Sequence, residues 1–124
     1  MRLILALALL ASVPALAQDF NCRNEKAEIR CDSGACEIES EGFTPMGLTR
    51  RGNTLSICAY SGCSEGAILV RRTRDGITLL YAEVRLTQPG KREAEPLAVI
   101  YEPAQQTAQM RWGGFSNVMT CGGR

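Results

Sequence analysis

The chain has 124 residues, of which 14 are basic, 13 are acidic and none is histidine. A formal net charge of +1 is too small for a general nucleic-acid-binding protein, which needs a strongly basic surface. Without histidine, Ser-His-Asp and Cys-His catalytic arrangements are excluded within the chain, and the commonest general base near neutral pH is missing.

The first 17 residues have the pattern of a secretory signal peptide. A positive start is followed by an apolar run at residues 3–10, too short to span a membrane, and by a small-x-small cleavage site at residues 15–17. A lipoprotein anchor would need a cysteine directly after this site, and Cys22 lies too far downstream. We therefore expect an exported protein, periplasmic or secreted, with no membrane anchor and a single domain over residues 18–124.

All six cysteines lie beyond this segment, and an even number predicts three disulfides in an oxidising compartment. Two pairs share the same spacing and flank predicted turns, so each pair can close its own turn, and the remaining two cysteines then join the chain ends. The preferred pairing is Cys31–Cys36, Cys58–Cys63 and Cys22–Cys121. The main rival couples the first hairpin to Cys58 or Cys63. The spacing fits neither a Cys-x-x-Cys redox site nor a zinc site, so we expect no metal and no cofactor.

Alternation of apolar and polar residues predicts short strands in the first half of the domain. The start of the domain, residues 18–22, has no clear pattern. Residues 25–31 and 36–40 alternate on either side of the turn signal at 32–34, which predicts a hairpin with an acidic outer face. A short strand is expected at residues 46–50 and another at 53–60, followed by a cysteine-containing turn from Ser61 to Gly66.

Asp75-Gly76 is the clearest local signal in the chain. Between two strand-like runs it predicts a two-residue type I′ hairpin turn, because both central residues need positive φ. The register then pairs Arg74 with Ile77, Arg72 with Leu79 and Arg71 with Leu80. It places Ala67, Leu69, Leu80, Ala82, Val84 and Leu86 on the core side. The other face carries Ile68, Val70, Leu79, Tyr81, Glu83 and Arg85.

Three further strands are predicted after a polar loop, at residues 97–101, 107–112 and 115–121. Many short strands, close turns and no helical stripe predict an all-β fold. We expect a small antiparallel meander, closed or partly closed into a barrel and stapled by disulfides, with a two-layer β-sandwich as the alternative. Closure is favoured because it removes exposed strand edges.

Charge is distributed unevenly along the domain. Seven acidic residues lie between Asp19 and Glu41, and five arginines lie between Arg50 and Arg74. The two segments are expected to face each other or to face water. The alternative is a basic patch for an anionic partner.

No catalytic motif is present, and we expect a protein that is not an enzyme. The preferred function is a binding domain for another protein, with inhibition as one form of it. The alternative is a small-ligand carrier that uses the barrel interior, and the least favoured is a carboxylate-based hydrolase using Glu37, Glu39 and Glu65. A monomer is expected, and no nucleic-acid partner.

Aromatic and charged side chains supply the candidate binding surface, because tyrosine and tryptophan commonly anchor interfaces. Tyr81, Tyr101 and Trp112 fall on three successive predicted strands, so they either line one surface or belong to the core. The full candidate set is Tyr60, Glu65, Arg72, Tyr81, Arg85, Tyr101, Arg111 and Trp112.

Overall fold

The computed structural model describes residues 18–60, 62–88 and 93–122; the predicted signal peptide lies outside these ranges. The described residues form ten strands and one short 3-10 helix. In chain order these are β1 (Phe20–Arg23), β2 (Glu28–Asp32), β3 (Ala35–Glu39), β4 (Gly47–Arg51), β5 (Thr54–Ala59), β6 (Gly62–Arg74), β7 (Ile77–Leu86), β8 (Glu95–Glu102), η1 (Pro103–Gln105), β9 (Thr107–Trp112) and β10 (Phe115–Gly122).

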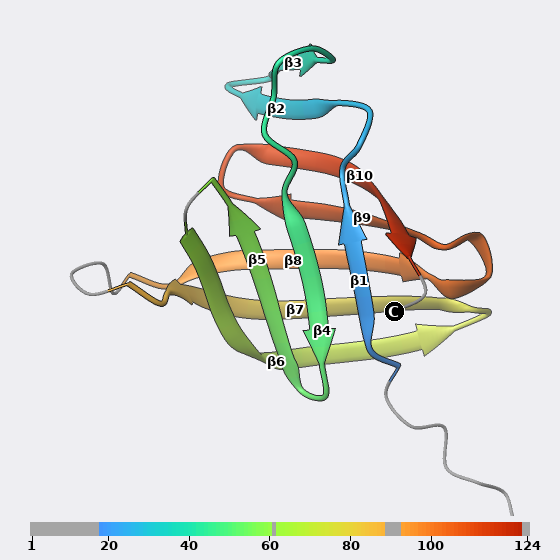
Figure 1. Ribbon diagram of the computed structural model, residues 1–124. Coiled ribbons are helices and arrows are strands. Elements are labelled where there is room, and N and C mark those ends of the chain that lie inside the picture. Colours follow the sequence, from blue (N-terminus) through green and yellow to red (C-terminus); the bar gives the residue numbers. More distant parts are fainter. Residues whose placement is uncertain (1–17, 61, 89–92, 123–124) are drawn as a thin grey trace, which may run out of the picture.

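Eight of these strands close into an antiparallel β-barrel, as the sequence predicted (Figure 1). Strands β4 to β10 form a continuous meander in which each strand pairs with the next. Strand β1 fills the gap between the two ends of the meander, because it pairs with β4 on one side and with β10 on the other. Strand β1 was not predicted, because it is short and places only Phe20 and Cys22 in the core.

A disulfide crosses the seam where the barrel closes. Cys22 on β1 lies directly opposite Cys121 on β10, and their sulfurs are bonded with a Cα–Cα distance of 3.9 Å. The other two disulfides are Cys31–Cys36 and Cys58–Cys63, and no free cysteine remains among the described residues. These are the three pairs preferred from the sequence.

Side chains from all eight barrel strands fill the interior. They alternate with outward-facing residues along each strand, as expected for a pleated strand. Near one end of the barrel the rings of Phe20 and Tyr101 pack with their centroids 4.3 Å apart. The buried apolar residues are Phe20, Cys22, Met46, Leu48, Leu55, Ile57, Ile68, Leu80, Ala82, Val84, Leu97, Val99, Tyr101, Ala108, Met110, Met119 and Cys121.

The hairpin between β6 and β7 has the predicted turn and, near the turn, the predicted register. Asp75 and Gly76 have φ angles of 51° and 79°, and all three predicted pairs are present. A β-bulge then shifts the register between Ile68 and Val70. The prediction that Ala67 and Leu69 face the core was therefore wrong: both are exposed, and Ile68 is buried instead. An extra residue in one strand inverts the faces of every residue beyond it.

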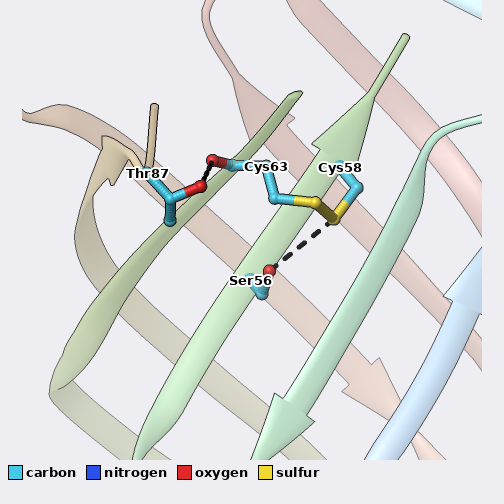
Figure 2. The surroundings of a disulfide bond; sticks show 4 residues. All are labelled: Ser56, Cys58, Cys63 and Thr87. Atoms are coloured by element: carbon cyan, nitrogen blue, oxygen red, sulfur yellow. Dashed lines mark hydrogen bonds between the residues drawn. A yellow bond between two sulfur atoms is a disulfide. The ribbon is translucent and has the colours of Figure 1, made fainter. Parts of the chain in front are cut away.

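The predicted turn over Ser61 to Gly66 was also wrong, because β6 already begins at Gly62. Cys58 and Cys63 lie directly opposite each other, and their disulfide bridges β5 and β6 (Figure 2). The Thr87 hydroxyl donates a hydrogen bond of 3.1 Å to the backbone oxygen of Cys63. Gly66 lies within this strand. A glycine is required there because a side chain would collide with the carbonyl oxygen of Glu83 on β7.

Removing the seam disulfide is expected to cost more stability than removing a turn disulfide. Cys22 and Cys121 are 99 residues apart, whereas Cys31 and Cys36 are five apart. In the chain-entropy model, replacing the first pair with alanine lowers the free energy of unfolding by about 4.7 kcal/mol, and replacing the second by about 2 kcal/mol. Urea unfolding of the oxidised protein measures both. Equal losses would contradict the closing role of the seam disulfide.

Tyr101 is expected to make the fold sensitive to alkali. Burial raises the pKa of its phenol above the ordinary value. Its contribution to stability is complete below about pH 10, where the unfolded chain also keeps the proton. It is lost as the pH rises toward the higher pKa of the folded state, because the unfolded chain ionises first. The free energy of unfolding, measured across this pH range, should fall less in Tyr101→Phe than in wild type. Equal falls in the two proteins would refute the expectation.

Candidate functional site

Residues 24–46 leave the barrel wall and return to it. They carry the β2–β3 hairpin, which stands at one end of the barrel (Figure 1). The strand pairing between this hairpin and the barrel is a single residue pair, Arg30 with Phe115 on β10. One further backbone hydrogen bond of 2.7 Å runs from the Cys31 amide to the Gly114 carbonyl. So short a ladder needs other contacts to fix the hairpin.

Two buried asparagines supply those contacts. Asn24 is fully buried; its Oδ1 accepts a 2.5 Å hydrogen bond from the Met46 amide, and its Nδ2 donates to the Ala27 carbonyl at 3.0 Å. It therefore ties the first residues of the excursion to the last. Asn117 on β10 is also buried, and its Oδ1 accepts a 2.7 Å hydrogen bond from the Ile29 amide on β2. Buried amides with satisfied partners hold a segment in one position.

A cleft of about 400 Å³ lies beside the hairpin. We call it the acidic cleft, since its lining carries four glutamates and a single arginine. Cross-strand register explains most of this grouping. Glu28 pairs with Glu39 and Arg30 pairs with Glu37, which places these two pairs on one face of the hairpin. The full lining is Glu28, Arg30, Glu37, Ile38, Glu39, Glu41, Gly42, Phe43, Thr44 and Tyr60.

Glu28 is the most unusual of these residues. Its side chain is buried, and its Oε2 lies 3.4 Å from Nε of Arg30. Its Oε1 is also buried and has no hydrogen-bond partner among the described residues. An unsatisfied buried acceptor costs about 1–3 kcal/mol, and more when it is charged. This oxygen is therefore an acceptor that the described residues leave unpaired beneath the surface of the cleft.

Three groups contact the Arg30 side chain. Besides the contact with Glu28, its Nη2 donates to the Tyr60 hydroxyl at 3.1 Å. Its guanidinium also lies 4.9 Å from the centroid of the Phe115 ring, a cation–π distance. The Arg30 guanidinium, the single cationic group in the lining, is thus already paired. The remaining glutamates give the cleft an excess of negative charge.

Exposed apolar groups stand among these charges. The side chain of Ile38 is 71 % exposed and that of Tyr60 is 63 % exposed. Tyr60 has a positive φ of 57°, a left-handed conformation that is uncommon for residues other than glycine. A large exposed aliphatic or aromatic side chain beside fixed charges is the usual composition of a protein-binding surface.

The structure does not unite the eight predicted surface residues. Tyr60 lies in the acidic cleft, but Tyr101 is buried inside the barrel. Trp112 is partly buried against the core, with its ring stacked on Phe115 at 6.0 Å. Tyr81, by contrast, lies between the buried Leu80 and Ala82 and faces outward, so the three aromatic residues do not line one surface, and the alternative of a core position holds for Tyr101.

The remaining predicted residues lie on the outer wall of the barrel. Glu65 on β6 is directly opposite Arg85 on β7, Arg72 lies farther along β6, and Arg111 lies on β9. Of the three glutamates in the hydrolase hypothesis, Glu37 and Glu39 line the acidic cleft and Glu65 does not.

Three cleft residues, Glu28, Arg30 and Phe43, were not among the predicted site residues. The predicted hairpin carried a usable signal for the first two, because pairing residues 25–31 with 36–40 across the turn already places Glu28 and Arg30 beside the recognised glutamates. Nothing local indicated Phe43, which lies in the segment that leads back to the barrel.

No protein-family model, no curated protein and no solved structure matches this chain. Within residues 18–60, 62–88 and 93–122, no group of three or more cysteine, aspartate or glutamate side chains could hold a metal ion. The same residues contain no helix long and apolar enough to cross a membrane.

Loss of the Asn117 amide should loosen the hairpin while the barrel stays closed. In Asn117→Ala the Ile29 amide loses its acceptor, and the expected loss in free energy of unfolding is about 1–3 kcal/mol. Hydrogen exchange should accelerate at Ile29 and its neighbours on β2 more than on β7 or β8. Asn21→Ala, at an exposed position of β1, is the matched control. Unchanged exchange at Ile29 would show that the asparagine does not hold the hairpin.

Proposed function

We propose that this protein is an exported binding protein that holds a basic segment of another protein in the acidic cleft. The observation that carries the proposal is the predominantly negative lining of the acidic cleft, in which Glu37 and Glu39 are exposed and the single arginine is already paired. A lysine or arginine side chain from the partner would pair with these two exposed carboxylates. Charge-assisted hydrogen bonds of this kind are among the stronger polar contacts.

Rigidity of the hairpin supports the proposal. The Cys31–Cys36 disulfide closes its turn, and Asn24 and Asn117 fix its base. A binding element that is already ordered loses less conformational entropy when a partner docks. Ile38 and Tyr60 would add apolar contact around the cation. A rigid hairpin that projects from a barrel is also suited to cover a site on its partner, so inhibition is the form of binding that we favour.

The packed interior favours binding outside the barrel over carriage of a ligand within it. Inward side chains from all eight barrel strands are buried against one another. Three disulfides fit an oxidising, exported location, and we propose the periplasm or the extracellular medium.

Binding of a labelled peptide tests the proposal. The probe is a short fluorescein-labelled peptide of alternating arginine and phenylalanine, and the readout is fluorescence anisotropy at low ionic strength. Glu37→Gln/Glu39→Gln should weaken binding by roughly 3- to 10-fold, because each exposed charge pair contributes about 0.2–1 kcal/mol. Added salt should weaken it further through screening.

Glu65→Gln/Glu83→Gln is the matched control, since it removes the same two charges from exposed strand positions outside the cleft. It should leave the affinity unchanged. The proposal fails if the peptide does not bind, or if the control and the cleft variant lose affinity equally.

A further inference from the structure

The second half of β6 has an unpaired edge. Strand β5 pairs with β6 only as far as Thr54 with Ala67, and one more backbone hydrogen bond, from the Ile68 amide to the Asn53 carbonyl, follows at 2.8 Å. Beyond this point β6 continues past the β4–β5 turn (Figure 1). Within the part of the chain that the structure describes, residues 69–74 pair with β7 alone. Their other side presents backbone donors and acceptors to solvent.

Exposed apolar side chains are spread over the outer wall between this edge and β10. Of the eight large apolar side chains that are exposed among the described residues, six lie on β6 to β10. Leu79 and Ile100 are direct cross-strand neighbours on the outer wall. They line a shallow hollow of about 400 Å³ together with the smaller Ala98 and Ser116 and the polar Gln109 and Arg111. The six residues are Leu69, Val70, Ile77, Leu79, Ile100 and Val118.

The same edge is strongly basic. Arg71, Arg72 and Arg74 lie on it, and Arg71 is near enough to Arg50 that its charge, after burial, lowers the pKa of the Arg50 guanidinium. Asp19 raises that pKa, but its carboxylate already accepts a hydrogen bond from the Gly52 amide. Asp75 forms an exposed ion pair with Arg74 at 3.8 Å. Arginines therefore outnumber carboxylates around the edge.

We propose that residues 69–74 and the adjoining outer wall form a second binding surface, which takes an extended acidic segment of another polypeptide as an added strand. This goes beyond the proposed function, because it lies on different strands and has the opposite charge. Val70, Arg72 and Arg74 pair with the outward-facing Tyr81, Leu79 and Ile77. An added strand would place carboxylates beside the two arginines and an apolar side chain beside Val70, since neighbouring strands align side chains on one face.

The free backbone groups decide between a polypeptide and a lipid surface. A strand satisfies them by continuing the sheet, whereas hydrocarbon leaves them without partners. Two copies of this chain joined through β6 would bring arginines against arginines, which disfavours that dimer. Strand β3 is acidic and is the last strand in the sheet order, so β3 of a second copy is the alternative occupant of this edge. The experiment below distinguishes that self-association from binding of another polypeptide.

The test uses a short fluorescein-labelled peptide in which Glu, Thr, Glu, Thr and Val follow one another. At low ionic strength it should bind, as measured by anisotropy, and should slow hydrogen exchange at residues 69–74. Arg72→Glu/Arg74→Glu should lower the affinity about tenfold or more, because the variant replaces attraction with repulsion. Arg23→Glu/Lys26→Glu, a matched double reversal at two exposed positions away from β6, should not. A peptide N-methylated on its backbone should bind much more weakly.

Several results would overturn the proposal. These are no binding, equal losses in both charge-reversed proteins, or full binding of the N-methylated peptide. Binding of the protein to phosphatidylglycerol vesicles with no protection of residues 69–74 would assign the surface to lipid. Salt-sensitive self-association of the protein alone, seen by sedimentation velocity, would assign it to β3 of a second copy. If the Glu37→Gln/Glu39→Gln variant no longer bound the acidic peptide, the peptide's site would be the acidic cleft. Unchanged binding of the peptide by this variant keeps the two proposals independent.

Discussion

Pairing between β1 and β10, fastened by Cys22–Cys121, is the contact on which the barrel depends. Without it, the meander from β4 to β10 would be a curved sheet with two open edges. β1 contributes only four residues to the wall, so its own ladder is short. The disulfide offsets that weakness by holding β1 against the last strand. Closure also positions the acidic cleft, because the chain leaves β1 for the hairpin directly after the seam.

Both proposed surfaces arise where the chain departs from a regular barrel. The acidic cleft exists because residues 24–46 leave the wall before β4 begins. The basic edge, residues 69–74, exists because β6 extends beyond the end of its pairing with β5. Apart from Asp19, which lies near Arg50, the acidic and basic segments lie away from each other: the β2–β3 hairpin and the β4–β5 turn are at opposite ends of the barrel (Figure 1). The two ends of the barrel therefore carry mostly opposite charge.

Local chemistry explains what could be predicted from the sequence. Asp75-Gly76 specified its own turn and register, and the cysteine spacings specified disulfides that close within a hairpin. Long-range contacts explain the rest. No residue near Leu69 indicates the bulge. The carbonyl that excludes a side chain at Gly66 belongs to β7. Asn117 accepts a hydrogen bond from the Ile29 amide, 88 residues away in the sequence. The predicted surface failed for a related reason, since strand alternation shows that Tyr81 and Tyr101 belong to a sheet but not which one faces inward.

Of the two short-range disulfides, one lies in the β2–β3 hairpin and the other joins two strands of the barrel wall. Cys31–Cys36 closes the hairpin whose like charges repel, and Cys58–Cys63 fixes β5 to β6 before the bulge. Clustered glutamates, an unpaired buried carboxylate oxygen and an open basic edge all reduce stability in the free protein. At the hairpin, the Cys31–Cys36 link counters that loss without filling the cleft itself. The core gives no reason to place a cross-link at this turn, so its position supports a role for the hairpin in binding.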